Sequence, residues 1–459
     1  MTSKNDYVVA IDLGTTKIVA LVGKLESNGR LKILAHSKTV STGVRRGMVQ
    51  NIDETVKAIE TVVADVRQKA GLDFTEVYIG IAGQHIKGIK NRGLINLNTF
   101  DAEVSKEDVR RLINDMHKIP LEPGDKILHV IPQNFIVDNE VGIKNPVGIS
   151  GRRLEANFHI VVGQIAAMKN IERCIERAGL SVKELMLEPL ASARAVLTED
   201  EMEAGVALID IGGGTTDLAI FHDGIVRHTA VIPFGGNIIT DDIKKGCSIL
   251  QRHAEQLKVQ FGSAIGELAP SDKIVTIPGI SGRDPKEIKF SHLAHIIQCR
   301  LEEIIDMLKF QITNSGFGDM LNAGIVITGG GSLLKDLPQL FKYHTGYDVR
   351  VGKPNINTVA NSDNEMNSPM HATGIGLMLL GFEDMYNRAE EEQKKAEAAP
   401  QPVQTVADTT TTVEPKIEVE PEEKPRKPHK AKSSEFLGKW KEKIGGLFSD
   451  DDFTFDQKP

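Results

Sequence analysis

A glycine-rich turn between two apolar runs constrains the fold of this chain more than any other part of its sequence. Residues 205–221 read GVALIDIGGGTTDLAIF, which predicts a buried strand, a tight turn and a second buried strand. Glycines lack the Cβ atoms that would keep a ligand away from the backbone, so their amides can surround an anion. The candidate anion-binding residues are Gly212, Gly213, Gly214, Thr215 and Thr216. Asp210 closes the first strand, where a carboxylate can hold a hydrated Mg2+ beside phosphates. An ordinary hairpin with a flexible tip is the alternative.

The same layout occurs near the beginning of the chain. Residues 7–22 read YVVAIDLGTTKIVALV, again a strand, an Asp-x-Gly turn with two threonines, and a strand. A second set of candidate phosphate-binding residues follows: Asp12, Gly14, Thr15, Thr16 and Lys17. Asp12 joins Asp210 as a candidate to hold Mg2+ through water. Two such hairpins predict two similar domains that face a nucleotide in the cleft between them.

Two further glycine turns follow along the chain. The first leads into a helix whose N-terminus can attract an anion, with candidate residues Gly235, Gly236 and Asn237. The second, in residues 325–334 (IVITGGGSLL), joins a strand to a helix, with candidate residues Gly329, Gly330, Gly331 and Ser332. One glycine turn is weak evidence, but their order and spacing together are far more specific. The sequence contains no Gly-x4-Gly-Lys-Ser/Thr P-loop and no Gly-x-Gly-x-x-Gly dinucleotide turn.

The paired hairpins resemble the two phosphate-binding loops of the superfamily that contains actin, sugar kinases and heat-shock chaperones. The resemblance implies an α/β fold of two actin-like domains around a nucleotide cleft, with ATP and Mg2+ as cofactors. In that superfamily the acidic residue of a Glu-Pro-x-Ala-x-Ala segment faces the γ-phosphate. Glu188 is therefore the candidate for orienting the attacking water, and Glu188 and Asp210 are the candidate catalytic residues. For Glu188, a carboxylate stabilised by a helix N-terminus is the alternative.

The resemblance extends to the nucleoside. The turn at residues 325–334 is similar to the superfamily's adenosine motif, and residues 254–258 resemble the helix beside the nucleoside. It implies that Glu255 accepts hydrogen bonds from ribose hydroxyls and that Lys258 flanks the adenine. An i,i+3 surface pair explains these two residues equally well.

Residues 84–162 predict an inserted α+β subdomain. Ser105 and Asp108 form a predicted capping box for a helix, and strands are predicted on both sides of a turn-rich loop. Actin does not carry such an insertion, whereas the FtsA family of bacterial cell-division proteins does. The run Arg153-Leu154-Glu155-Ala156 followed by His159 resembles that family, and His159 itself is predicted to be structural.

The resemblance sets the expected domain boundaries. The first actin-like domain comprises residues 1–83, 163–203 and 357–388, with 84–162 inserted. The second comprises a core of residues 204–233 and 322–356 and an outer subdomain of residues 234–321. Residues 389–433 are poor in aromatics and are predicted to be a disordered linker with a reach of roughly 35 Å.

Residues 434–449 predict an amphipathic helix. At about 100° per residue one face gathers the apolar side chains, with two lysines at its edges. The candidate membrane-binding residues are Phe436, Leu437, Trp440, Lys441, Lys443, Ile444, Leu447 and Phe448. FtsA proteins are similarly tethered by a C-terminal amphipathic helix, so an anionic lipid membrane is the expected partner. A helix docked on its own domain is the alternative.

Composition excludes several classes of protein. The formal net charge of −8 gives no reason to expect nucleic-acid binding. The three cysteines are widely spaced and predict reduced thiols. No signal peptide and no run of about 18 apolar residues is present, which predicts a cytoplasmic protein.

The FtsA resemblance implies an ATP-binding scaffold that polymerises on the cytoplasmic face of the inner membrane at the division site. Its implied partners are FtsZ, which it tethers, further copies of itself, and later division proteins that the inserted subdomain recruits. ATP hydrolysis is left open; where present it would be slow. The alternatives are a PilM-like scaffold of type IV pili and, from another class, a kinase of the same superfamily. A heat-shock chaperone fits the sequence poorly, because a linker, not a β-rich substrate domain, follows the predicted ATPase.

Overall fold

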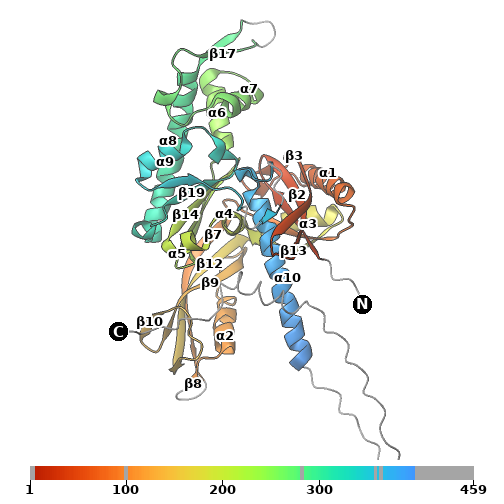
Figure 1. Ribbon diagram of the computed structural model, residues 1–459, viewed down its shortest axis with the longest axis vertical. Helices are drawn as coiled ribbons and strands as arrows, with labels where there is room; N and C mark the ends of the chain where they lie inside the picture. The colour runs from red at the N-terminus through yellow and green to blue at the C-terminus, as the bar shows by residue number, and fades with distance from the viewer. Residues whose placement is uncertain (1–5, 98–101, 280–283, 356–358, 361–364, 399–459) are drawn as a thin grey trace, which may run out of the picture. The chain divides into compact units, whose positions relative to one another are not determined.

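The computed structural model describes residues 6–97, 102–279, 284–355, 359–360 and 365–398. By its internal contacts the chain divides into two units, Met1–Phe382 and Glu383–Pro459 (Figure 1). The first unit contains both sheets predicted from the paired hairpins and the inserted subdomain.

The first actin-like domain is built on a six-stranded sheet of order β13-β6-β1-β2-β3-β21. Its strands are β1 (Tyr7–Leu13), β2 (Lys17–Leu25), β3 (Leu31–Val40), β6 (Glu76–Ile81), β13 (Ser181–Leu187) and β21 (Val359–Ala360). The remaining elements are the small hairpin β4 (Val44–Arg45) and β5 (Met48–Val49), and helices α1 (Ile52–Ala70), α3 (Ile165–Arg177) and α4 (Glu188–Val196). Helix α1 begins after the N-cap Asn51 and ends at the left-handed Gly71.

The second sheet repeats the topology of the first. Its order β16-β15-β14-β19-β20 corresponds to β3-β2-β1-β6-β13, with the same antiparallel and parallel pairings. The strands are β14 (Val206–Ile211), β15 (Thr216–His222), β16 (Ile225–Ile232), β19 (Ile325–Thr328) and β20 (Val349–Val351). The prediction of two similar domains is confirmed.

Helices cover this second sheet. The remaining elements of the second domain are these helices and two small strands: α5 (Glu199–Ala204), α6 (Gly236–Cys247), α7 (Gln251–Phe261), η1 (Gly266–Leu268), β17 (Ile274–Ile277), β18 (Lys286–Lys289), α8 (Phe290–Ser315), η3 (Gly318–Met320), η4 (Gly330–Leu333) and α9 (Leu337–Thr345). One buried core joins Ile209 of the sheet to Ile243 and Leu301 of the helices. The predicted outer subdomain, residues 234–321, thus shares its core with the rest of the second domain.

The inserted subdomain has a sheet of order β10-β9-β12-β7. Its elements are β7 (Ile86–Asn96), β8 (Ala102–Glu103), α2 (Lys106–Met116), β9 (Asp125–Val137), β10 (Glu140–Ile143), β11 (Ser150–Gly151) and β12 (Arg153–Gln164). The predicted capping box of Ser105 and Asp108 is present. Leu112, Phe135 and Leu154 belong to a separate core, while Ile86 and Val161 pack in the core of the first domain. The insertion therefore has a core of its own but grows out of the first domain.

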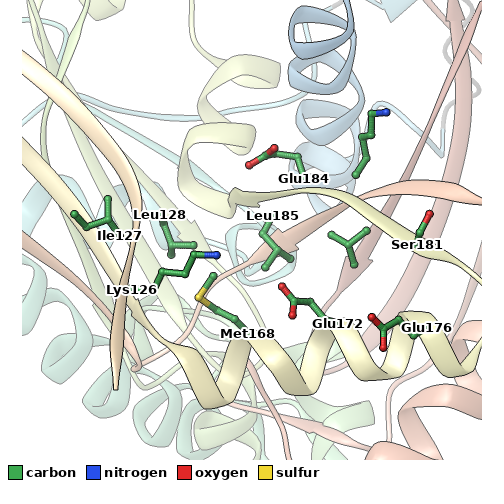
Figure 2. A pocket seen from close by; sticks show the side chains of 11 residues that line it. Lys126, Ile127, Leu128, Met168, Glu172, Glu176, Ser181, Glu184 and Leu185 are labelled. Atoms are coloured by element: carbon green, nitrogen blue, oxygen red, sulfur yellow. The ribbon is translucent and has the colours of Figure 1, made fainter. Parts of the chain in front are cut away.

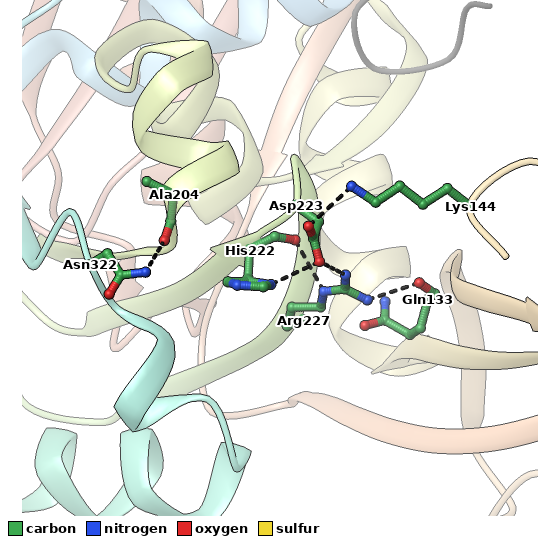
Figure 3. Close-up of polar contacts among 7 residues, drawn as sticks. All are labelled: Gln133, Lys144, Ala204, His222, Asp223, Arg227 and Asn322. Carbon is green, nitrogen blue, oxygen red and sulfur yellow. Dashed lines mark hydrogen bonds and ion pairs between the residues drawn. The ribbon is translucent and has the colours of Figure 1, made fainter. Parts of the chain in front are cut away.

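Polar side chains join the inserted subdomain to β16, the edge strand of the second sheet (Figure 3). Arg227 donates to the Gln133 carbonyl at 2.8 Å and to Asp223 at 3.0 Å. Lys144 lies 3.1 Å from Asp223, and His159 Nε2 lies 2.9 Å from Thr229 Oγ1. We call this set, Gln133, Lys144 and His159 against Asp223, Arg227 and Thr229, the seam. His159 is buried within it, in agreement with its predicted structural role.

The last described elements are η5 (Pro369–His371) and α10 (Ala372–Ala398). Helix α10 packs closely against α4, since a Cβ on Gly376 would lie 1.7 Å from the Ala191 carbonyl oxygen. The helix runs to Ala398, past residue 389 where the linker is predicted to begin, because residues 383–398 are rich in Ala, Glu and Lys, which are strong helix formers. The rest of the predicted linker and the amphipathic helix at 434–449 lie outside the described residues. Among the described helices, none combines the length and apolar character needed to cross a membrane.

Candidate functional site

The two predicted phosphate-binding hairpins face each other in the first unit. A Cβ on Gly213 would lie 1.9 Å from Thr16 Oγ1, and a Cβ on Gly214 would lie 2.5 Å from Thr15 Oγ1. The β14–β15 turn therefore touches the threonines of the β1–β2 turn, and glycine is the residue that permits the contact. Sequence repetition predicted that the two hairpins face one another, but not that their turns are in contact.

The start of α6 is joined to the same place. Gly236 N–H donates to the Gly212 carbonyl at 2.9 Å, and Asn237 N–H donates to the Gly213 carbonyl at 2.8 Å. A Cβ on Gly235 would lie 2.5 Å from the Gly212 oxygen, which is a backbone atom that cannot rotate away. The turn before α6 and the turn after β14 are thus one rigid structure.

The last glycine turn closes on the end of β14. Gly329 has a left-handed φ of 81°, and a Cβ there would lie 2.2 Å from Asp210 Oδ1. A Cβ on Gly331 would meet the Ile211 side chain at 2.3 Å. Ser332 is buried and donates its hydroxyl to the Gly329 carbonyl at 2.7 Å, so it stabilises the turn. All the predicted glycine turns therefore converge on the carboxyl ends of β1 and β14.

Asp210 lies at the centre of this arrangement. Its Oδ2 accepts hydrogen bonds from Ser192 at 2.6 Å and from Thr373 at 3.2 Å. Burial raises the pKa of Asp210, and these two hydrogen bonds oppose the shift. The two hydroxyls come from α4 and α10, so the first domain fixes the orientation of a carboxylate that belongs to the second.

Asp12 and Asp217 are buried carboxylates beside Asp210. Burial raises the pKa of Asp12 to about 6, an effect that the charge of Lys17 opposes. Asp217 pairs directly with Asp210 across β14 and β15, and burial together with that charge raises its pKa to about 8. Like charges placed opposite each other in a sheet destabilise it. The cleft thus gathers carboxyl groups whose ionisation the surrounding protein disfavours.

Glu188 begins α4, where the sequence predicts it. Burial, and then the charges of Asp12, Asp217 and Asp210, raise its pKa well above its ordinary value. Within the described residues Glu188 makes no hydrogen bond and no ion pair. Once ionised, a carboxylate with a raised pKa is a stronger base toward water than an ordinary carboxylate, which is the property that a general base needs.

The donor set fits magnesium held through water. In the described part of the chain, no three His, Cys, Asp or Glu side chains converge closely enough to ligate a metal directly. Mg2+ retains most of its water shell and needs only one or two carboxylates with nearby phosphates. Asp12 and Asp210 are suited to that role. Lys17, whose Nζ donates to the Met370 carbonyl at 2.7 Å, supplies the positive charge beside them.

Glu255 and Lys258 lie next to the turn before α6. Lys258 Nζ donates to the Gly236 carbonyl at 2.9 Å and pairs with Glu255 at 2.8 Å. Thr240 also donates to Glu255. The i,i+3 pair that the sequence left open is therefore present, and it lies at a predicted nucleotide-binding turn.

Two threonines differ from the sequence-based expectation. Thr216 is fully buried, and its hydroxyl donates to the Phe234 carbonyl at 2.9 Å. The Thr215 hydroxyl donates to Asp217 at 3.0 Å. Both hydroxyls brace the turn, whereas the sequence predicted that they would line an anion-binding concavity. The reason is that buried hydroxyl donors take the nearest protein acceptor.

Sequence reasoning missed Asp217, Ser192 and Thr373. Asp217 directly follows the Gly-Gly-Gly-Thr-Thr run, and Ser192 lies one helical turn after Glu188, so both were within the quoted motifs. Nothing near Thr373 in the sequence indicated its contact with Asp210, which is 163 residues away.

Two cavities bear on the site differently. One of about 420 Å³ lies between β9, α3 and β13 and is lined by Lys126, Met168, Glu172 and Leu185 among others (Figure 2). No predicted site residue lines it. Another of about 590 Å³ is lined by Thr15 and Asn237 together with Arg45, Asn51 and Glu54. This second cavity adjoins the phosphate-binding turns.

Sequence comparisons identify the family. The family model described as "Cell division protein FtsA" matches residues 207–376, and the one described as "SHS2 domain inserted in FTSA" matches residues 83–162. Cell division protein FtsA of Pseudomonas aeruginosa is 36% identical over 376 residues, covering 82% of this chain and 89% of that protein. The chain belongs to the FtsA family. It is an actin-like cell-division protein, and the predicted insertion coincides with the family's SHS2 domain.

Two further FtsA proteins are similar to this chain over most of its length. The one from Neisseria meningitidis serogroup B is 38% identical, with 82% of this chain and 91% of that protein covered. The one from Escherichia coli K12 is 34% identical, with 85% of this chain and 94% of that protein covered.

Solved structures show the actin-like fold. A PilM–PilN type IV pilus biogenesis complex has a TM-score of 0.59 at 15% identity, covering 82% of this chain and 98% of that one. MreB5 of Spiroplasma citri bound to AMPPNP has a TM-score of 0.53 at 15% identity, covering 85% and 99%. Sequence identity thus decides for FtsA over the PilM alternative.

Proposed function

We propose that this FtsA-family chain binds Mg-ATP in the cleft between its two actin-like domains. The observation that carries the proposal is the convergence of the glycine turns on Asp210, beside buried carboxyl groups that would ionise readily only with a cation nearby. A divalent cation with phosphates would supply the missing countercharge. The structural neighbour MreB5 is bound to AMPPNP, which supports a nucleotide in a fold of this kind.

The chain's own residues would have distinct roles in binding Mg-ATP and in its hydrolysis. The amides of Gly213 and Gly214 and the hydroxyls of Thr15 and Thr16 would bind phosphate oxygens. Ser192 and Thr373 hold Asp210 in a fixed orientation, so the carboxylate needs no rearrangement to meet hydrated magnesium. When bound, Mg-ATP supplies charge that draws the two domains together. Slow hydrolysis would use Glu188 to orient water and accept its proton.

We further propose that the protein polymerises at the inner membrane and tethers FtsZ there. Family membership supports the role in division, and the sequence at residues 434–449 supports a peripheral membrane helix. A nucleotide that favours one arrangement of the two domains would favour filament contacts by the same free energy. Filament formation would reinforce weak membrane binding by individual tails through avidity.

Calorimetric titration with Mg-ATP tests the central claim. Asp210→Ala should weaken binding at least tenfold, about 1.4 kcal/mol, because it removes the acceptor beside magnesium. Asp65→Ala is the matched control, since Asp65 lies on the exposed face of α1 and pairs only with nearby Lys69 and Ser37. Wild-type affinity in a folded Asp210→Ala variant would contradict the proposal.

Co-sedimentation tests the scaffold role. With ATP, the protein should carry FtsZ into the pellet with anionic vesicles, and Trp440→Glu should abolish vesicle binding while leaving ATP affinity intact. If Trp440→Glu still sediments like the wild type, the tail is not the anchor. If FtsZ stays in the supernatant, the tethering proposal fails.

A further inference from the structure

The small hairpin β4–β5 connects three parts of the first unit. Its strands pair Arg45 with Met48, so Arg46 and Gly47 form a two-residue turn. Gly47 N–H donates to Thr15 Oγ1 at 3.3 Å, which joins the hairpin to the first phosphate-binding turn. A Cβ on Gly47 would lie 2.5 Å from the Ala82 carbonyl oxygen, so the tip also packs where the chain leaves β6 for the inserted subdomain.

Arg46 reaches from this turn to the second domain. Its guanidinium carbon lies 5.9 Å from the centroid of the Phe234 ring. Phe234 precedes Gly235, and its carbonyl accepts the Thr216 hydroxyl. Since the turn before α6 is rigidly bonded to the β14–β15 turn, a contact with Phe234 is a contact with the second phosphate-binding turn.

The backbone at Arg46 is unfavourable for arginine. Arg46 has a φ of 51° and Gly47 a φ of 73°, the pattern of a type I′ turn. Asparagine or glycine suits the first of these positions, whereas a long side chain there is strained. Strain that a structure retains at one residue points to a use for that side chain. The cation–π contact with Phe234 supplies such a use, because in the described part of the chain Arg46 has no carboxylate partner.

The hairpin also forms a wall of the cavity of about 590 Å³. Val44 and Arg45 line that cavity with Thr15 and Asn237, one residue from each side of the nucleotide cleft. Displacement of the hairpin would therefore widen the space beside the phosphate-binding turns.

We infer that the Arg46 turn is a latch across the nucleotide cleft: the contact of Arg46 with Phe234 holds the two domains together and slows the release of bound nucleotide. Arg46 is a positioning residue, acting through Phe234 and Thr15. The inference rests on the proposed ATP binding. It adds a determinant of how long the nucleotide stays bound.

Arg46→Asn is the decisive variant, because asparagine favours the left-handed backbone and only the side-chain contact is lost. A fluorescent ATP analogue, preloaded on the full-length protein and chased with excess ATP, should dissociate about three- to tenfold faster than from wild type. Arg46→Lys keeps a cation and should lie between the two. Arg110→Ala, at an exposed pair with Glu107 on α2, is the matched control and should leave the rate unchanged.

A double-mutant cycle distinguishes a latch from a general loss of structure. Phe234→Leu should accelerate release as Arg46→Asn does, and the double variant should be no faster than either single one. Phe234→Tyr keeps the aromatic face and should release nucleotide at the wild-type rate. Multiplicative effects in the double variant, or unchanged release from Arg46→Asn, would overturn the latch.

Hydrogen exchange tests the latch without nucleotide, so its failure is separable from failure of ATP binding. In Arg46→Asn, residues 44–49 and 212–216 should both exchange faster than in the wild type, because the two turns brace each other through Phe234. Unchanged exchange in residues 212–216 would overturn the inference even if the wild type binds ATP. Lack of ATP binding by the wild type would instead reject the proposed function.

Discussion

The proposed nucleotide cleft and the seam both join parts of the first unit, yet their buried polar groups differ in environment. In the seam, Arg227 has Asp223 and a backbone carbonyl as partners, and His159 has Thr229. In the cleft, Asp12 and Asp217 have pKa values raised to about 6 and about 8, and Glu188 has no hydrogen-bonding partner among the described residues.

The difference separates a structural contact from a functional one. Buried polar groups that find partners specify how two elements fit together, at little net cost. Buried like charges that lack partners destabilise the fold, and they persist where a ligand provides the missing charge. The cleft therefore bears the cost of burying several carboxyl groups together. In the seam, Arg227 and Asp223 satisfy each other, and of the buried ring nitrogens of His159 only Nε2 has a partner in the described part of the chain.

The largest expected effect comes from closing the space between the turns. Gly235→Ala places a methyl group against the Gly212 and Thr215 carbonyl oxygens, which cannot rotate away. The turns must then separate, and we expect Mg-ATP affinity to fall about a hundredfold, roughly 2.7 kcal/mol, by calorimetry. Gly224→Ala is the control. It meets no atom within 4 Å but has a φ of 74°, so it should cost about 1 kcal/mol of stability and leave affinity unchanged. If Gly224→Ala lowers Mg-ATP affinity as much as Gly235→Ala does, the cleft and the seam do not differ in the way described above.

The seam should respond in the opposite sense. Arg227→Ala leaves Asp223 and the Gln133 carbonyl without their shared donor, so we expect about 2 kcal/mol of lost unfolding free energy in urea titrations. Mg-ATP affinity should not change. Lys144→Ala removes only an exposed pair with the same Asp223 and should cost less than about 0.5 kcal/mol. If both variants lose a similar amount of unfolding free energy, the seam depends on a positive charge near Asp223 and not on the buried guanidinium of Arg227.

Removing one of the opposed cleft carboxylates should stabilise the ligand-free protein. The pKa of Asp217 is about 8 when folded, above its ordinary 3.8, so the folded state binds more protons than the unfolded state between about pH 4 and pH 8. Stability due to this group therefore falls as the pH rises through that window. Asp217→Asn removes the dependence and should raise the unfolding free energy by about 1–2 kcal/mol at pH 7.5. Thermal unfolding between pH 6 and pH 8.5 checks this, and an unchanged slope contradicts it.

The smallest effect concerns the histidine of the seam. Burial lowers the pKa of His159 to about 4, below its ordinary 6.5, so the unfolded state binds more protons between about pH 4 and pH 6.5. Stability due to His159 rises with pH through that window and is lost on acidification. Between pH 7 and pH 5, wild type should lose about 1 kcal/mol more than His159→Gln, measured by thermal unfolding. His129 and His371, whose pKa values are also near 4, contribute the same trend in both proteins. Equal losses would mean that folding does not lower the pKa of His159.

Local sequence determined much of the fold. The repeated pattern of strand, Asp-x-Gly turn and strand predicted two similar domains, and both sheets have the same strand order. The capping box of Ser105 and Asp108 predicted the start of a helix correctly. These features depend on backbone conformation and on side chains a few residues apart, so a single sequence is enough to predict them.

Tertiary structure decided which of these residues act on one another. Thr373 donates to Asp210 across 163 residues, and Arg46 lies over Phe234. Neither contact can be predicted from the neighbouring residues in the sequence. The hydroxyl of Thr216 faces a carbonyl rather than the cleft because of the neighbouring Phe234 segment. The raised pKa of Asp217 likewise requires burial and the opposed Asp210 together. Sequence alone determined that the glycine turns exist and in what order. Their mutual contact, and the raised pKa values of the carboxyl groups beside them, arise only when distant segments pack together and exclude water.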